Sequence, residues 1–361
     1  MSESSGYNGA TKSTEKNPVK WDLRSDTVTK PTPEMLKVMM AAETGDDVFG
    51  EDPSISRFEK RVAELFGKED GLFCASGTLS NQLGIRSHLK VPPYSVVCDA
   101  NAHVYVHEAG GIAYHSLALT VPVEPLANKR YITLEEIKKK IFLDNGDFHI
   151  APTRLICLEN TINGMVFPIE EIRKISAYAR EHNIGMHMDG ARIWNASIAS
   201  GTPFTEYGKC FDSISICFSK GMGAPVGSVL VGSKEFIANA RKFRKLFGAG
   251  WRQAGILAEA ANYTIDNHLP LLQNDHKRAK CLADQLSQLG IKFLFPVETS
   301  ILFVDFSSTG INAHHVAEAL KEAGVLVIAF SEVALRIVFH HQVQEGAVEA
   351  VVEVIKKLLQ A

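Results

Sequence analysis

Short apolar runs alternate with helical patterns through the first two thirds of the chain. Helical spacing of Ile55, Phe58, Val62 and Leu65 predicts a helix over 54–66, and a second helix is predicted over 169–182. The apolar runs are GLFCAS (71–76), SVVCD (95–99), RLICLEN (154–160), IGMHMDG (184–190), SISICFS (213–219) and GSVLVGS (227–233). Strands that alternate with helices indicate an α/β fold, with a mostly parallel sheet covered on both faces.

The pattern changes after about residue 266. Helices are predicted over 276–289, 313–323 and 343–359, and strands over 300–306, 325–328 and 334–339. This mixture indicates a small α+β domain. We therefore expect a disordered tail over 1–17, a large domain with its N-terminal segment over 18–265, and the small domain over 266–361.

Composition and charge exclude several function classes. The 361 residues are 45% hydrophobic and 22% charged with a net charge of -3, so we expect neither nucleic acid nor an anionic membrane as partner. No apolar segment reaches the ~20 residues of a membrane helix, and the polar N-terminus lacks the core of a secretory signal. The six scattered cysteines contain no CxxC pair, which predicts reduced thiols, a cytoplasmic location and no metal site.

Polar residues stand at the ends of three predicted strands. They are the pair Glu159 and Asn160, then Asp189, then the pair Ser219 and Lys220. Ligands of open α/β sheets bind at the carboxyl ends of strands, so these ends are expected to converge on one crevice.

Lys220 stands between an apolar strand and the glycines of KGMGAPVG. Most lysines in such loops are solvated. A lysine that is partly desolvated at a strand end loses its proton more easily and can attack an aldehyde as a free amine. The order of residues fits neither a Walker loop nor a dinucleotide fingerprint.

Two further stretches carry candidate chemistry. In HMDGARIWN, Asp189 is either a helix N-cap or a carboxylate that pairs with a heterocyclic nitrogen, and Arg192 is either a surface residue or a clamp for a substrate carboxylate. In ASGTLSN (75–81), small hydroxylic residues precede a helix, and free backbone N–H groups there suit a phosphate.

Together these stretches resemble the low-specificity L-threonine aldolase family. The matching motifs, from about Trp21 onward, are WDLRSDTVTKPTPEML, GDDVFGEDP, SGTLSNQ, AHVYVHEAGG, LENT, MDGARIWN and FSKGMGAPVGSVLVG. The long tail is similar to that of eukaryotic, fungal members. The resemblance implies a pyridoxal 5'-phosphate enzyme of fold type I, with a mostly parallel seven-stranded sheet in the large domain.

The resemblance also implies roles for individual residues. Lys220 would form the Schiff base with the cofactor, Asp189 would pair with its ring nitrogen, and His103 would stack on the ring. The phosphate would be held by Gly77, Thr78, Arg252 and Lys245, the last across a subunit interface. The substrate carboxylate would be bound by Ser25, Arg192 and Arg336, with Arg192 also near the cofactor. His149 would lie near the substrate hydroxyl, and His107 would line the substrate pocket.

The reaction implied is cleavage of L-threonine or L-allo-threonine into glycine and acetaldehyde, in a homodimer or homotetramer with active sites at subunit interfaces. The alternative is an alanine racemase on the same scaffold, because Trp251 replaces a small residue of the family pattern and would narrow the pocket. A non-catalytic interaction protein is the third reading, and the presence of both Lys220 and Asp189 argues against it.

Overall fold

The computed structural model describes residues 18–360. They form two compact units, each described here by itself: the larger holds 30–162 and 166–269, and the smaller holds 18–29, 163–165 and 270–360. The boundary predicted from the sequence lies near 266, and residues 18–29, predicted to belong with the larger domain, fall in the smaller unit. The predicted tail over 1–17 lies outside the described residues.

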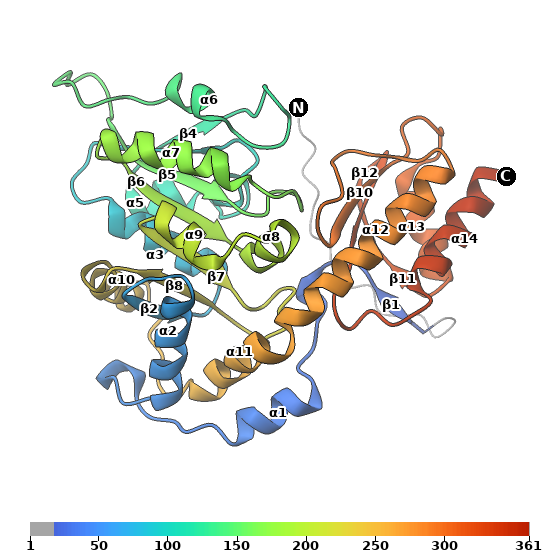
Figure 1. The fold of residues 1–361 in the computed structure, drawn as a ribbon, viewed down its shortest axis with the longest axis horizontal. Helices are drawn as coiled ribbons and strands as arrows, with labels where there is room; N and C mark the ends of the chain where they lie inside the picture. Colours follow the sequence, from blue (N-terminus) through green and yellow to red (C-terminus); the bar gives the residue numbers. More distant parts are fainter. Residues whose placement is uncertain (1–17, 361) are drawn as a thin grey trace. The chain divides into compact units, whose positions relative to one another are not determined.

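Within residues 18–360, the larger unit is built on a seven-stranded sheet with the strand order β2-β8-β7-β6-β5-β3-β4 (Figure 1). Only β8 within this sheet runs antiparallel to its neighbours β2 and β7. The strands are β2 (Asp70–Cys74), β3 (Ser95–Asp99), β4 (Leu119–Val123), β5 (Thr153–Glu159), β6 (Gly185–Gly190), β7 (Ser213–Cys217) and β8 (Ser228–Gly232). The predicted α/β class with a mostly parallel sheet is confirmed, although the sequence pattern missed β4.

Helices cover both faces of this sheet. α3, α5 and α10 pack on one face, and α2, α7 and α9 on the other (Figure 1). The helices of the unit are α1 (Pro33–Met40), α2 (Pro53–Leu65), α3 (Gly77–His88), α4 (His103–Val106), α5 (Gly111–Ser116), α6 (Leu134–Lys138), α7 (Ile169–Glu181), α8 (Ile193–Ser200), α9 (Phe204–Cys210), α10 (Lys234–Leu246) and α11 (Gly255–Asn267), with the short 3-10 helix η2 (Asp47–Phe49).

Local sequence explains where α2 begins and which face it buries. The Asp52 carboxylate caps the helix by accepting the N–H of Ile55 at 3.0 Å, and Pro53 occupies the first turn, where its missing N–H costs nothing. Phe58 and Val62 follow at helical spacing and are fully buried against the sheet. Their burial, worth about 2 kcal/mol per side chain, holds α2 in place.

The smaller unit has its own core. A four-stranded antiparallel sheet has the order β12-β13-β10-β9, and β1 pairs with β11 in parallel. Its elements are β1 (Trp21–Asp22), η1 (Asp26–Val28), α12 (Leu272–Gln288), β9 (Lys292–Phe293), β10 (Ile301–Asp305), α13 (Ala313–Glu322), β11 (Val325–Leu326), β12 (Ile328–Ser331), β13 (Ala334–Val338) and α14 (Ala347–Gln360), and η3 (Leu269–Leu271) lies at the junction. Leu302, Val316, Leu335 and Val351 are completely buried in this core.

The described helices include none that combines the length and the apolar character needed to cross a bilayer.

Candidate functional site

Three strand ends meet at the carboxyl edge of the larger unit's sheet. Glu159 at the end of β5 lies opposite Asp189 at the end of β6, and β7 runs beside β6. Lys220 follows β7 by three residues, and its charge acts on Glu159. Burial raises the pKa of the Glu159 carboxyl to about 8, and the nearby Asp189 adds to this effect. The predicted convergence of these three residues is confirmed.

Asp189 is buried, and both of its oxygens are held. Oδ1 accepts the backbone N–H of Ala191 at 3.0 Å, and Oδ2 accepts the Asn81 side-chain amide at 2.8 Å. Arg192, rather than Asp189, occupies the N-cap of α8. The helix-cap interpretation of Asp189 is therefore wrong, and its carboxylate has the fixed direction that pairing with a ring nitrogen requires.

Lys220 is half-buried beside a buried thiol. Its Nζ lies 3.7 Å from Sγ of Cys217, and burial raises the pKa of that thiol while the charges of Lys220 and Arg192 oppose the rise. A tight turn follows, in which the N–H of Gly223 donates to the Lys220 carbonyl at 2.7 Å. Gly223 has φ 81°, a conformation that side-chain-bearing residues rarely adopt, which explains the glycine at this position of the turn.

His103 lies in the same cluster. Its Nδ1 is 2.9 Å from Oε1 of the buried Glu108, and its backbone N–H donates to Glu159 at 2.7 Å. The hydrogen bond to Glu108 raises the pKa of the His103 imidazole above its ordinary value of 6.5. The polar atoms of His103, Glu108 and Asp189 all lie within 4.8 Å of one another. The exposed His107 ring is 5.6 Å from that of His103.

The N-terminus of α3 offers backbone donors for a phosphate. Ser76 caps the helix, with its hydroxyl accepting the N–H of Leu79 at 3.1 Å, and Thr78 is exposed in the first turn. A Cβ on Gly77 would lie 2.6 Å from Sγ of Cys217 on β7. The glycine therefore lets α3 begin in close contact with the strand that precedes Lys220, where its free N–H groups and dipole suit an anion.

Gly77→Ala is expected to destabilise the protein by about 1–3 kcal/mol, because the new methyl group overlaps the buried Cys217 sulfur and one of the two must shift. Denaturant unfolding measures this loss. The double variant Gly77→Ala/Cys217→Ala removes the overlapping sulfur and should recover most of it. A single Gly77→Ala variant with wild-type stability would contradict the close approach of α3 and β7.

The two other predicted phosphate ligands lie elsewhere on the larger unit. The exposed Arg252 forms an ion pair with Asp46 at 2.8 Å. The exposed Lys245, on α10, lines a cavity of about 420 Å³ together with Asp47 and Arg244. Their phosphate-binding roles stay predictions.

Two of the predicted carboxylate-binding residues belong to the smaller unit. Arg336 on β13 donates from Nη1 to the carbonyl of Arg24 at 3.1 Å, directly before Ser25. Ser25 caps η1, its hydroxyl accepting the N–H of Thr27 at 3.3 Å. The structure thus brings Ser25 and Arg336 together, whereas Arg192 belongs to the larger unit.

His149 lies at the other end of the sheet from the cluster. It is exposed, its backbone N–H donates to Asp147 at 2.9 Å, and it precedes β5, whereas Glu159 ends that strand. Seven strand residues span roughly 20 Å. Within one chain, His149 therefore lies too far from Glu159 to share its crevice.

Sequence reasoning missed Asn81, Glu108 and His187. Asn81 donates to both Asp189 and Glu108, and its Oδ1 lies 3.2 Å from Nε2 of His187. A signal was present on β6, where His187 and Asp189 alternate with methionines. Two polar side chains on one face of a buried strand need partners on the helix that covers it.

Comparisons with known proteins identify the family of this chain. The family model described as beta-eliminating lyase matches residues 22–309. The low specificity L-threonine aldolase of Saccharomyces cerevisiae is 47% identical over 331 residues, 91% of this chain and 84% of the relative. The low specificity L-threonine aldolase of Escherichia coli O157:H7 is 42% identical over 308 residues, 85% of this chain and 90% of the relative.

Solved structures show the same fold. The Leishmania major threonine aldolase structure aligns with a TM-score of 0.79 over 94% of this chain and 99% of that one, at 21% identity. At this identity the likeness establishes the fold alone.

Proposed function

Since the chain belongs to the beta-eliminating lyase family, we propose that it is a pyridoxal-phosphate-dependent L-threonine aldolase, which cleaves L-threonine or L-allo-threonine to glycine and acetaldehyde. One observation carries the proposal. Lys220 follows β7 at the carboxyl edge of the sheet, where the neighbouring strand presents Asp189 with both carboxylate oxygens fixed.

The residues present fit the cofactor. When bound, pyridoxal phosphate supplies an aldehyde for covalent capture of an amine and a protonated ring that withdraws electrons from bonds at Cα. Lys220 would hold the aldehyde carbon, Asp189 the ring nitrogen, and the N-terminus of α3 the phosphate. The close approach of Gly77 to Cys217 supports this, because it places the anion-binding helix end against the strand that leads to Lys220.

The chain's own residues orient the substrate. Arg192 would bind its carboxylate, and this contact would decide which bond at Cα stands in the reactive direction, a positioning effect. The carboxylate-binding roles of Ser25 and Arg336 stay predictions. His103, held by Glu108 through Nδ1, would present its ring to the cofactor plane in one fixed orientation. For an aldolase the Cα–Cβ bond is the one aligned.

The alanine racemase alternative rested on Trp251 narrowing the substrate pocket. In the structure its indole stacks on Phe73, with ring centroids 5.6 Å apart, and its Nε1–H donates to the Phe73 carbonyl at 3.2 Å. These contacts give Trp251 a packing role against β2, and no observation favours the racemase.

An assay of the purified holoenzyme with L-threonine and with L-alanine tests the proposal. We expect acetaldehyde release from L-threonine and no D-alanine from L-alanine. The reverse result would replace the aldolase by the racemase, and activity on neither substrate would reject both.

His149 would act on the substrate hydroxyl in the site of a second copy of the chain. Its position before β5 separates it from its own chain's cluster, so the proposed role requires at least a dimer. There, His149 or a water that it orients would take the proton of the β-hydroxyl as the carbon–carbon bond breaks. The cytoplasmic location and a role in glycine supply stay predictions.

Mixed assemblies of Lys220→Ala and His149→Ala subunits are expected to be active although each parent is not. The His149→Ala subunit keeps Lys220 and receives an intact His149 from its partner, so each hybrid pair should recover roughly half of the wild-type rate. Coexpression with two affinity tags isolates the hybrids. Hybrids that are no more active than either parent would contradict the proposal. They would indicate either that His149 and Lys220 act in the site of one chain or that His149 takes no part in the reaction.

A further inference from the structure

A continuous chain of polar side chains crosses the core beneath α3 and ends at Asp189. Nε2 of His88 lies 2.8 Å from the Ser213 hydroxyl, which lies 2.8 Å from Nδ1 of His187. Nε2 of His187 lies 3.2 Å from Oδ1 of Asn81, and Nδ2 of Asn81 lies 2.8 Å from Asp189. The inner members, from Ser213 to Asp189, are buried. Such a buried chain holds its side chains in one arrangement only if every donor is paired with an acceptor.

The orientation of each member follows from its neighbours. Asn81 meets carboxylate oxygens of both Glu108 and Asp189, so its NH₂ group must face them and its oxygen must face His187. Nε2 of His187 therefore carries the proton and Nδ1 accepts. The Ser213 hydroxyl consequently donates to His187, and its oxygen accepts from His88.

Both histidines are neutral, as this pattern demands. Burial lowers the pKa of His187 to about 3 and that of His88 to about 4. A neutral imidazole has one donor and one acceptor nitrogen, so each histidine can accept a hydrogen bond on one side and donate one on the other. All donors point toward Asp189, and their dipoles stabilise a negative charge on its carboxylate.

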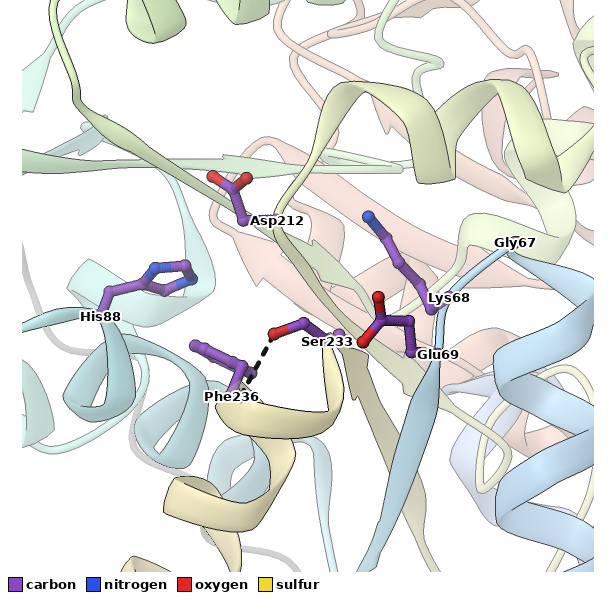
Figure 2. Close-up of a pocket in the computed structure, with 8 residues that line it drawn as sticks. Gly67, Lys68, Glu69, His88, Asp212, Ser233 and Phe236 are labelled. Carbon is purple, nitrogen blue, oxygen red and sulfur yellow. Dashed lines mark hydrogen bonds between the residues drawn. The ribbon is translucent and has the colours of Figure 1, made fainter.

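The outer end of the chain borders a cavity of about 380 Å³ on the larger unit. His88, Lys68, Asp212 and Ser233 line it (Figure 2). The hydrogen-bonded chain thus runs from the wall of an open pocket through the core to the candidate site.

We propose that Asn81 and His187 are positioning residues that aim the Asp189 carboxylate at the cofactor ring nitrogen and stabilise its charge. This inference rests on the proposed function. The Asn81 amide supplies the hydrogen bond, and His187 fixes the direction in which that amide points. Neither residue touches the reacting bond, so both act through Asp189.

Absorbance titration of the cofactor-bound protein against pH tests this without any substrate. Asn81→Leu removes the donor at nearly constant volume, and His187→Leu removes the group that orients it. We expect each to move the titration midpoint of the visible band by about one pH unit and to weaken cofactor affinity by roughly tenfold. The other ionisable groups around Asp189 keep their identity in both variants: Glu159, Cys217, Lys220, His103 and Glu108. Asn81→Leu also removes a hydrogen bond from Glu108, which His187→Leu leaves in place, so a shift shared by both variants reports on Asp189.

His187→Gln is the conservative variant, because its side-chain amide can again donate to Asn81. It should keep the wild-type midpoint and an affinity within about threefold of wild type. Unchanged midpoints and affinities in both leucine variants, with only a loss of thermal stability, would overturn the inference and assign the chain to packing. If the midpoint shifted in His187→Gln as much as in His187→Leu, the orienting role proposed for His187 would be contradicted. If the wild-type protein itself bound no cofactor, the proposed function would fail first, so the two failures are distinguishable.

Discussion

Lys220→Ala is expected to abolish threonine cleavage and the visible absorbance of the bound cofactor together. Lys220 is the amine at the carboxyl edge of the sheet, half-buried against the Cys217 thiol, and no other group can replace its covalent bond to the cofactor aldehyde. Removal of such a nucleophile lowers kcat by ~10⁴-fold or more. Acetaldehyde release and an absorption spectrum of the same sample measure both effects.

Lys209→Ala is the matched control for this prediction. Lys209 is exposed on α9 and pairs with Glu206 at the surface, so its loss should leave rate and spectrum unchanged. Borohydride reduction of the wild-type holoenzyme, followed by peptide mass spectrometry, should locate the cofactor on Lys220. A label on another lysine would reject the assignment and the mechanism built on it.

Asp189→Asn is expected to lower kcat on the order of 100-fold while the fold survives. The amide has nearly the same shape, but it cannot supply the negative charge that keeps a ring nitrogen protonated. It also brings a donor toward Asn81, which already donates at 2.8 Å, so its orientation is constrained. Steady-state kinetics with L-threonine and a pH titration of the absorption spectrum measure the loss.

Asp284→Asn provides the comparison for that loss. Asp284 forms an exposed ion pair with Lys280 on α12, and its replacement should change neither kinetics nor spectrum. An Asp189→Asn enzyme that keeps wild-type kcat would show that the charge at this strand end is not used.

Much of the larger unit could be predicted because its strands are short, apolar and separated by clear helices. The edge strand β4 was not predicted because Leu119 is exposed, the next three strand residues are half-buried, and Pro122 interrupts the pattern. The pairing of β1 with β11 joins Trp21 to Val325, and no local pattern indicates a contact so distant in sequence.

The candidate site was likewise only partly predictable from the sequence. Lys220 and Asp189 could be found because each interrupts an apolar run at a strand end. Asn81 and His187 could not, because their importance lies in which atoms face each other across a helix and a strand. The distance of His149 from this cluster follows only once β5 is known to run from Thr153 to Glu159.

The interface between α3 and the sheet has a consequence for engineering. Ser80 on this helix is hydrogen-bonded to Ser228 at 2.8 Å and to Ser215, and Asn81 lies in the next position. Aliphatic replacements often stabilise a protein interior. Here they would leave the hydroxyl and amide partners buried without hydrogen bonds, which lowers stability. Thermostabilising libraries should therefore leave this layer unchanged and draw their substitutions from the apolar layer beneath α2 and α7.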